Sequence, residues 1–550
     1  MSMTPESANV HAHEPAVTCC RFEAGTVIGP ENLEDPTVLP ALIDSGFIRL
    51  PDHCLTIREA LGTTLKETIE GFTPLTPSLV EMPASIENRN RSLARDLDDE
   101  PHLEKIARKL IRQHIQIRQV KFCDTTEIKG NTLYLCAGIC QDALDADALV
   151  VDVKLDIVDP HHYRDYSHTI MDVQPIATKQ EGELGTGVTR VLDGVVVVVT
   201  GTDENGVQIG EFGSSEGSMQ HQIMWGRPGA PDAGDILVKT NVTIKANTQM
   251  ERPGPLAVHK ATDAIVQAIR HALKQADEAV VATEELVHQR RLGAPRVVII
   301  KEIMGQGAMH DNLLLPAEPV GVLGAKANVD LGNVPIVVSP LQVLDGAIHA
   351  LTCVGPASKE TSRHYWREPL VLEVMRDAEL DLCAVILVGS PQSNAEKNYV
   401  SRILGMTVEA MDVHGAIVTT EGFGNNHIDF AGHIEQIGKR GIPVVGMTYA
   451  AVQGQLVIGN RYMDAMVELN KSESGIEDCV LANNTLTHED AIRAIAMLKA
   501  KIVGERIQSA ESQWTPEVKL RNMRAIEQYT GQTIGRSARE RVFPDEVERR

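Results

Sequence analysis

From about residue 260 onward, short apolar runs alternate with segments of helical periodicity. An amphipathic helix is expected at residues 261–275, and the apolar runs that follow lie at 296–300, 384–388, 416–420 and 442–447. Strands that alternate with helices form parallel sheets covered on both faces. The pattern therefore predicts a multidomain α/β protein with a parallel α/β domain over about residues 378–505.

Two loops follow strands of this expected sheet, Gly389–Ser393 and Glu421–His427. Ligands of parallel sheets bind beyond the carboxyl ends of the strands. These loops are therefore candidates for a binding site, although tight turns without a ligand explain them equally well.

The middle of the chain predicts strands rather than helices, with a strand-rich part at 130–245. Residues 132–136 and the alternating run 150–158 are expected strands, and the run 194–201 is apolar enough for a strand buried on both faces. Ahead of them, His102–Gln116 predicts a helix, because Leu103, Ile106, Leu110 and Ile111 recur at helical spacing and place His114 at the edge of their face.

The expected organisation divides the chain into four parts. Residues 1–82 form a small N-terminal unit, 83–100 a charged linker, 101–352 a larger α/β region and 353–550 a C-terminal fragment. The last part ends in a polar segment, 517–550, that docks or forms a tail.

Composition narrows the class of protein. The chain has 52 basic and 75 acidic residues, a formal net charge of −23, which disfavours binding to nucleic acid or an anionic membrane. The N-terminus has no basic and apolar signal-peptide pattern, and nine scattered cysteines fit reduced thiols. Both observations predict a cytoplasmic protein.

Most of the other candidate ligands and thiols lack a functional spacing. Cys19–Cys20 has no second pair at zinc spacing, and His161, His162 and His221 lack a partner Glu, so no metal site is expected. Cys136 and Cys140 would face one way on a helix, but they do not have the spacing of thioredoxin-type sites.

Polar and potentially reactive side chains are most concentrated at residues 346–370. An apolar segment ends at Thr352–Cys353, the chain turns at Gly355–Pro356, and a polar run follows. That run contains Lys359, Glu360, Thr361, Ser362, Arg363, His364, Arg367 and Glu368. A thiol beside such groups suits a reactive cysteine. A buried cysteine that ends a strand before a charged surface helix is the alternative.

Residues 351–370 resemble the processing site of the D-proline reductase proprotein family, which is related to the substrate-binding components of glycine, sarcosine and betaine reductases. Residues 15–27 and 418–430 resemble the same family, and the likeness is weakest over 83–120. The resemblance implies that the precursor cuts itself before Cys353, which becomes an N-terminal pyruvoyl group. It further implies reductive cleavage of D-proline to 5-aminovalerate with a hetero-oligomeric partner subunit that carries selenocysteine or cysteine.

The residues support this chemistry in outline. The Cys353 thiol can attack the carbonyl of Thr352 and move the acyl group from nitrogen to sulfur, with strain from the turn as a plausible aid. A ketone formed there would activate a substrate amine as a leaving group. Candidate proton carriers are His364, Lys359 and Glu360, and Arg363 or Arg367 could bind a substrate carboxylate. A solvated helix face explains the same charges.

Two alternatives remain open at this point. The chain could be a sibling reductase component for glycine, sarcosine or betaine, or a paralogue that acts as a scaffold without processing.

Overall fold

The computed structural model describes the chain from residue 107 onward, with gaps. The described residues are 107–209, 217–249, 253–276, 280–303, 313–314, 333–346, 348–349, 361–391, 393–420, 425–449, 458–471, 480–507, 524, 527–528 and 531. The predicted N-terminal unit, the linker, Cys19–Cys20, and nearly all of the polar segment at 517–550 lie outside them.

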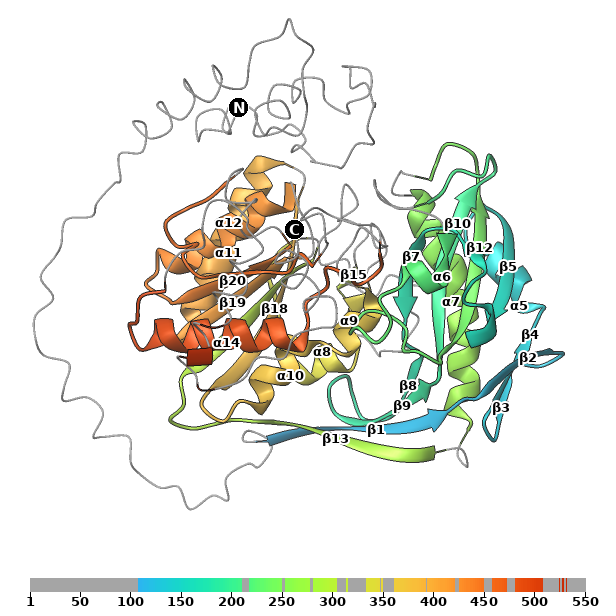
Figure 1. Ribbon diagram of the computed structural model, residues 1–550, viewed down its shortest axis with the longest axis horizontal. Helices are drawn as coiled ribbons and strands as arrows, with labels where there is room; N and C mark the ends of the chain where they lie inside the picture. The colour runs from blue at the N-terminus through green and yellow to red at the C-terminus, as the bar shows by residue number, and fades with distance from the viewer. Residues whose placement is uncertain are drawn as a thin grey trace, which may run out of the picture.

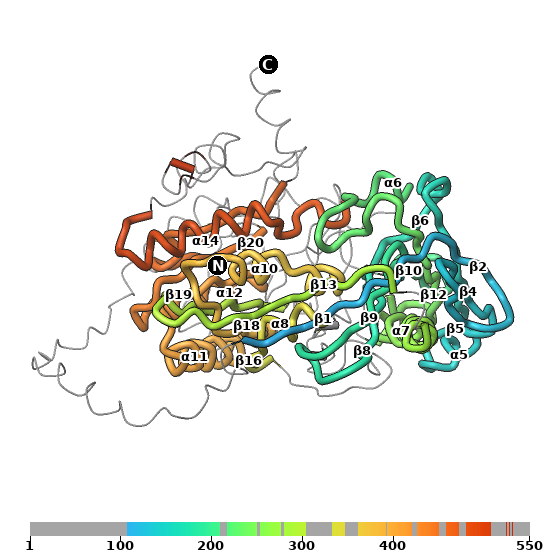
Figure 2. The backbone as a smooth tube through the Cα atoms, turned by 90° about the horizontal axis from the view of Figure 1, so that it is seen from below, coloured from blue at the N-terminus to red at the C-terminus, as the bar shows by residue number. Residues whose placement is uncertain are grey.

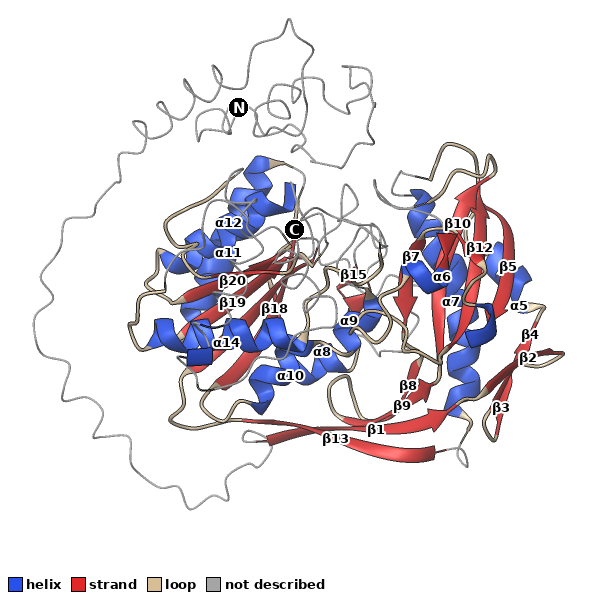
Figure 3. Ribbon diagram, viewed as in Figure 1, coloured by secondary structure: helices blue, strands red, loops and turns tan. Residues whose placement is uncertain are grey.

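A six-stranded sheet forms the core of the C-terminal region, with helices on both faces (Figures 1 and 3). Its strands, in spatial order, are β16 (Ile336–Val338), β18 (Asp381–Gly389), β14 (Arg296–Ile303), β19 (Gly415–Thr420), β20 (Val444–Thr448) and β21 (Met466–Glu468). Every neighbouring pair is parallel except the edge pair β16–β18. The predicted parallel α/β sheet is therefore confirmed.

The central strand β14 shows why both faces of this sheet are buried. Val297, Ile299 and Ile303 belong to one core, and Val298 and Ile300 belong to another. The first core is closed by α8 (Pro340–Leu344), α10 (Pro369–Arg376) and α14 (His488–Ile502), and the second by α11 (Asn394–Ala410) and α12 (Asn425–Gly438). Successive side chains of a strand point to opposite faces, so a continuous apolar run is what a strand between two helical layers requires.

The sheet also takes strands from before residue 353. β14 lies between β18 and β19, and β16 lies at the edge beside β18. The parallel sheet thus combines the strands of the predicted span 378–505 with these two earlier strands.

Two four-stranded sheets make up the strand-rich middle region, as predicted. One contains β13 (Val280–Gln289), β1 (Ala107–Gln116), β9 (Gly187–Asp193) and β8 (Ala177–Glu181); the other contains β5 (Val150–Val158), β12 (Ile236–Ile244), β10 (Val195–Asp203) and β7 (Ile170–Gln174). On β10, Val195, Val197 and Val199 pack toward the helix α7 (Pro253–Lys274), and Val196 and Val198 pack on the opposite side. Both faces are buried, which explains the five consecutive valines.

The prediction of a helix at His102–Gln116 is wrong, because residues 107–116 form the strand β1. β1 pairs with β13 and β9, and its Leu110 belongs to the C-terminal core whereas Ile115 belongs to the core of the middle region. Residues five apart lie on opposite faces of a strand. β1 therefore contributes buried residues to two different cores.

β1 and β13 run side by side along both regions (Figures 1 and 2). A second connection is Asp345, just after α8, whose carboxylate is fully buried. It lies 2.6 Å from the ammonium of Lys179 on β8 and accepts hydrogen bonds from the Gly185 N–H and the Thr189 hydroxyl. No helix within the described residues is long and apolar enough to cross a membrane.

Replacing Asp345 by Ala should lower the apparent free energy of unfolding by about 3–5 kcal/mol, because the buried ammonium of Lys179 would lose its counter-charge. Lys109→Ala is the matched control, since it removes an exposed pair with Glu285 at 3.0 Å and should cost about 0–1 kcal/mol. Urea denaturation followed by fluorescence measures both. Equal effects of the two substitutions would contradict the structural role of Asp345.

Candidate functional site

Two consecutive charged residues, Lys301 and Glu302, lie near the carboxyl end of β14, and both are fully buried. Alternation along the strand sends them to opposite faces of the sheet. This is the edge of a parallel sheet at which ligands usually bind. The two charges therefore mark two polar clusters, one on each face.

On the first face, Lys301 is paired with a carboxylate and an imidazole. Its Nζ lies 3.2 Å from Oε2 of Glu368, and Nε2 of His364 lies 2.5 Å from the same oxygen. Lys301 also lies 5.3 Å from the ring centroid of Tyr365. All four side chains have no exposed surface. A shared carboxylate between an ammonium and an imidazole can hold or relay a proton without contact with bulk water.

The short helix α9 (Ser362–Trp366) carries His364 and Tyr365. Thr361 caps it, accepting a hydrogen bond from the His364 N–H and donating its own hydroxyl to the Gly229 carbonyl at 2.8 Å. Thr361 at the N-cap is a favoured choice because its oxygen satisfies an N–H that has no partner within the helix. Glu368 then caps α10, so the cluster sits at the junction of two helices.

Asp172 on β7 fixes the start of α9 from the middle region. Its Oδ1 accepts from the Ser362 N–H at 3.0 Å, and its Oδ2 accepts from the Ser362 hydroxyl at 2.8 Å. Burial raises the pKa of Asp172 to about 6, although these hydrogen bonds act in the opposite direction.

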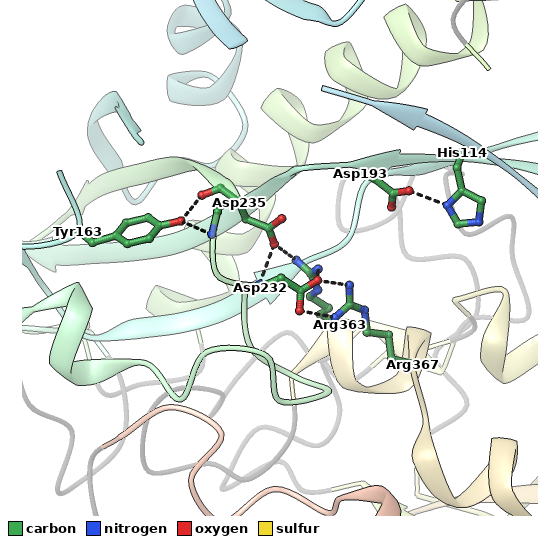
Figure 4. Close-up of polar contacts among 8 residues, drawn as sticks. His114, Tyr163, Asp193, Asp232, Asp235, Arg363 and Arg367 are labelled. Atoms are coloured by element: carbon green, nitrogen blue, oxygen red, sulfur yellow. Dashed lines mark hydrogen bonds and ion pairs between the residues drawn. The ribbon is translucent and has the colours of Figure 1, made fainter. Parts of the chain in front are cut away.

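Arg363 and Arg367 both point toward a loop of the middle region (Figure 4). Arg363 lies 3.0 Å from Asp235 and 3.1 Å from Asp232, and Arg367 makes a bidentate pair with Asp232 at 2.9 and 2.7 Å. Arg363 is buried, whereas the Arg367 side chain is 33% exposed. Both guanidinium groups therefore join α9 to the middle region, and their predicted binding of a substrate carboxylate stays a prediction.

On the opposite face of β14, Glu302 lies among polar groups from α11, α12 and β19. Its Oε1 accepts from the Thr420 hydroxyl at 3.0 Å, and its Oε2 lies 3.7 Å from Nε2 of His433. Burial and the nearby Asp429 raise the pKa of Glu302 well above its ordinary value. Burial also lowers the pKa of His433 to about 3. Burial thus favours the uncharged form of both groups.

Asp429 completes this second cluster. Its Oδ2 accepts from the Ser390 hydroxyl at 2.5 Å and is paired with the Lys397 ammonium. Ser390 belongs to the predicted Gly389–Ser393 loop. Of the predicted Glu421–His427 loop, residues 425–427 lie in the described part of the chain and form the start of α12. The structure therefore brings residues of both predicted loops to the carboxyl edge of the sheet.

The predicted processing residues Thr352 and Cys353, together with Lys359 and Glu360, lie outside the described residues. The segments on either side of them are described. β17 (Ile348–His349) ends before Thr352, pairs with β15 (Leu313–Leu314), and lies against α9. The chain before and after residues 352–353 therefore comes close to the cluster of Lys301, His364 and Glu368.

The sequence reading missed Lys301, Glu302 and Asp172. Lys301–Glu302 carried a signal, since a charged pair ends an otherwise apolar buried strand. Residues 132–136 form the predicted strand, β4 (Thr132–Cys136), and Cys140 lies in α5 (Ile139–Leu144), so Cys136 and Cys140 do not share one helix. Among the described residues, no group of three or more His, Cys, Asp or Glu side chains is arranged to hold a metal ion.

Residues 108–476 match the family model of the glycine/sarcosine/betaine reductase component B subunits. The chain is 54% identical to the D-proline reductase proprotein PrdA of Acetoanaerobium sticklandii, over 99% of the chain and 98% of that protein. It is 25% identical to the glycine reductase complex component B subunits alpha and beta of the same organism, over 68% of the chain and 84% of that protein. No solved structure matches the chain.

The Asp172→Asn variant should gain stability relative to the wild type as the pH rises from about 4 to 6. The wild-type carboxyl has a pKa near 6 when folded and near 3.8 when unfolded, so the native state holds the extra proton in this window and loses that advantage as the pH rises. An amide does not titrate, and the difference between the two proteins should change by about 3 kcal/mol at most. Denaturant titrations at several pH values measure it. The exposed Glu181→Gln should follow the wild type, and parallel wild-type and Asp172→Asn curves would contradict the expectation.

Proposed function

Because this chain belongs to the glycine/sarcosine/betaine reductase component B family, we propose that it is the precursor of a pyruvoyl-dependent reductase that cleaves the ring C–N bond of D-proline to give 5-aminovalerate. The 54% identity to a D-proline reductase proprotein over nearly the whole of both chains carries this proposal. The 25% identity to the glycine reductase subunits makes glycine the weaker choice of substrate.

Processing is proposed at Thr352–Cys353. The Cys353 sulfur attacks the Thr352 carbonyl, the peptide C–N bond breaks as a C–S bond forms, and the freed amine takes up a proton. β-Elimination then breaks the Cβ–S bond and leaves the sulfur on the Thr352 acyl group as a thiocarboxylate. The dehydroalanine at residue 353 tautomerises to an imine, and water hydrolyses the imine to the pyruvoyl group with release of ammonia. The name proprotein in the relative and the position of β17 beside α9 support this site.

The residues around α9 fit such a group. When formed, the pyruvoyl group supplies an electrophilic carbonyl for the substrate nitrogen, which no ordinary side chain provides. Lys301, Glu368 and His364 form a buried acid–base set next to the chain segments that flank residue 353. The buried hydroxyl of Tyr365 has no hydrogen-bond partner in the described part of the chain, so one more polar group can be accommodated there.

These side chains take distinct roles in the proposal. His364 holds and delivers a proton, Glu368 orients its imidazole, and Lys301 keeps the carboxylate ionised. Arg367 is the more accessible of the two arginines and is the stronger candidate for the substrate carboxylate, whereas Arg363 is buried between Asp232 and Asp235.

The protein is proposed to act in the cytoplasm within a complex. Four relatives are named as components of reductase complexes. A selenolate or thiolate of a partner subunit would attack the substrate α-carbon as the ring C–N bond breaks. A second thiol would then attack that selenium or sulfur, so that the carbon leaves with a proton as 5-aminovalerate and the two partner groups become a selenenyl sulfide or disulfide.

The processing proposal predicts fragments of residues 1–352 and 353–550, the second with 550 − 352 = 198 residues. The smaller fragment should resist Edman degradation and should be trapped covalently by borohydride with D-proline, because a ketone-derived adduct is reducible. Cys353→Ala should stay intact and inactive while folded, and Cys353→Ser should cleave slowly because a hydroxyl is the poorer nucleophile. Mass spectrometry checks each species.

Cys383→Ala is the control for this experiment and should be processed normally, because its thiol lies at the start of β18 and is paired with Arg296. An uncut wild-type protein that still reduces D-proline with its partner would refute the mechanism. A single full-length band without activity would favour a scaffold role.

The two fragments should stay together after cleavage. β14 belongs to the first fragment, yet lies between β18 and β19 of the second, with Val297, Val298, Ile299, Ile300 and Ile303 buried. Each buried side chain of this size contributes about 1.5–3 kcal/mol. Native gel filtration should give one peak and denaturing gel filtration two. Separation under native conditions would contradict the shared sheet.

A further inference from the structure

A small three-stranded sheet brings together two cysteines, Cys123 and Cys136, that are not neighbours in the sequence. β2 (Gln119–Cys123) pairs in parallel with β4, and Cys123 is the register partner of Cys136. β3 (Glu127–Lys129) occupies the other edge of β4. Neighbouring strands lie about 4.8 Å apart. That spacing is within the range of about 4.4–6.8 Å between Cα atoms that a disulfide spans.

The two thiols lie on the outer face of this sheet. Leu133 and Leu135 of β4 are fully buried in the core of the middle region, so the alternation of the strand turns Cys136 to the opposite face. Register partners on neighbouring strands share a face, which puts Cys123 beside Cys136. Cys123 is exposed, Cys136 is half-buried, and both are free thiols.

Cys140 is the third cysteine nearby, but it faces elsewhere. It lies in α5, packs against the same core as Leu133 and Leu135, and burial raises the pKa of its thiol. It is therefore on the inner side of the sheet, and a pairing of Cys136 with Cys140 is less favourable than one with Cys123. The described residues also form no metal-binding group here.

We propose that Cys123 and Cys136 form a surface dithiol that is reversibly oxidised by exchange with disulfide compounds. The thiolate of one cysteine attacks the external disulfide, forming a mixed disulfide and releasing one thiol. The second thiolate then attacks the protein sulfur of the mixed disulfide and releases the other thiol. The protein loses two protons and two electrons, and the external disulfide is reduced to two thiols.

The surroundings suit an intramolecular second step. The N–H of Cys136 donates to the Thr126 hydroxyl at 3.0 Å, which fixes the end of β4 in its register. Two thiols held on adjacent strands react at a high effective concentration, so the mixed disulfide should not persist. The site would give the chain a two-electron couple of its own, independent of residues 352–353.

Oxidised glutathione is the probe for the test. The reduced full-length protein is incubated with it at pH 8, free thiols are alkylated, and the protein is digested with trypsin without reduction. Trypsin cuts after Lys121, Lys129 and Lys154, so a disulfide joins peptide 122–129 to peptide 130–154. The expected product is this linked pair, with a loss of two hydrogens, and dithiothreitol reverses it.

Three variants assign the bond. Cys140→Ser should still form the linked pair, whereas Cys123→Ser and Cys136→Ser should not, and each should keep a glutathione adduct on its remaining partner. Circular dichroism confirms that the variants are folded. The proposal is overturned if the link is lost in Cys140→Ser and kept in Cys136→Ser. A glutathione adduct that persists on Cys123 of the wild type, without a linked pair, also overturns it.

Discussion

The burial of the Lys301 ammonium imposes the strongest constraint on the C-terminal region. A charge without solvent must have a counter-charge held in place, and removing one partner of such a pair costs several kcal/mol. Glu368 supplies that counter-charge from the junction of α9 and α10, and His364 shares it. The central strand, which precedes residue 353, is thereby tied to the first helices that follow it.

The other contacts that hold α9 in place come from residues of the middle region. Asp172 holds Ser362, Gly229 accepts from Thr361, and the loop at 232–235 holds two arginines. A five-residue helix has little stability of its own. Its position therefore depends on these contacts, and a shift of the middle region would displace His364 from the edge of the sheet. Both regions therefore position the same site, because α9 depends on its contacts with each of them.

The two faces of β14 carry different electrostatics at the same height of the sheet. On one, an ammonium, a carboxylate and an imidazole are in direct contact. On the other, burial and the nearby Asp429 raise the pKa of Glu302 well above its ordinary value, and burial lowers the pKa of His433 to about 3. A neutral carboxyl group can donate a hydrogen bond, whereas an ionised one only accepts. Burial therefore favours the protonated form of Glu302, which can donate a hydrogen bond, one residue away from the Lys301 ammonium.

The apolar runs at 296–300, 384–388 and 416–420 predicted their strands because burial between two helical layers leaves no other pattern. β1 could not be predicted in this way, since its buried residues serve two cores. The contacts of Asp172 and Arg363 depend on residues more than a hundred positions away, and no local pattern encodes them. Likewise, Cys123 and Cys136 are brought together by strand register, which the spacing of the cysteines does not reveal.

The position of β14 in the middle of its sheet favours synthesis of the two regions as one continuous chain. In one continuous chain, β14 reaches the gap between β18 and β19 as a tethered segment, at a high effective concentration. Two chains synthesised separately would instead have to meet, and until then the second would expose two unpaired strand edges, which invite aggregation. Under the proposed processing, the single precursor would therefore serve as its own assembly factor, and a cut made after folding would preserve an architecture that independent pieces would reach only with difficulty.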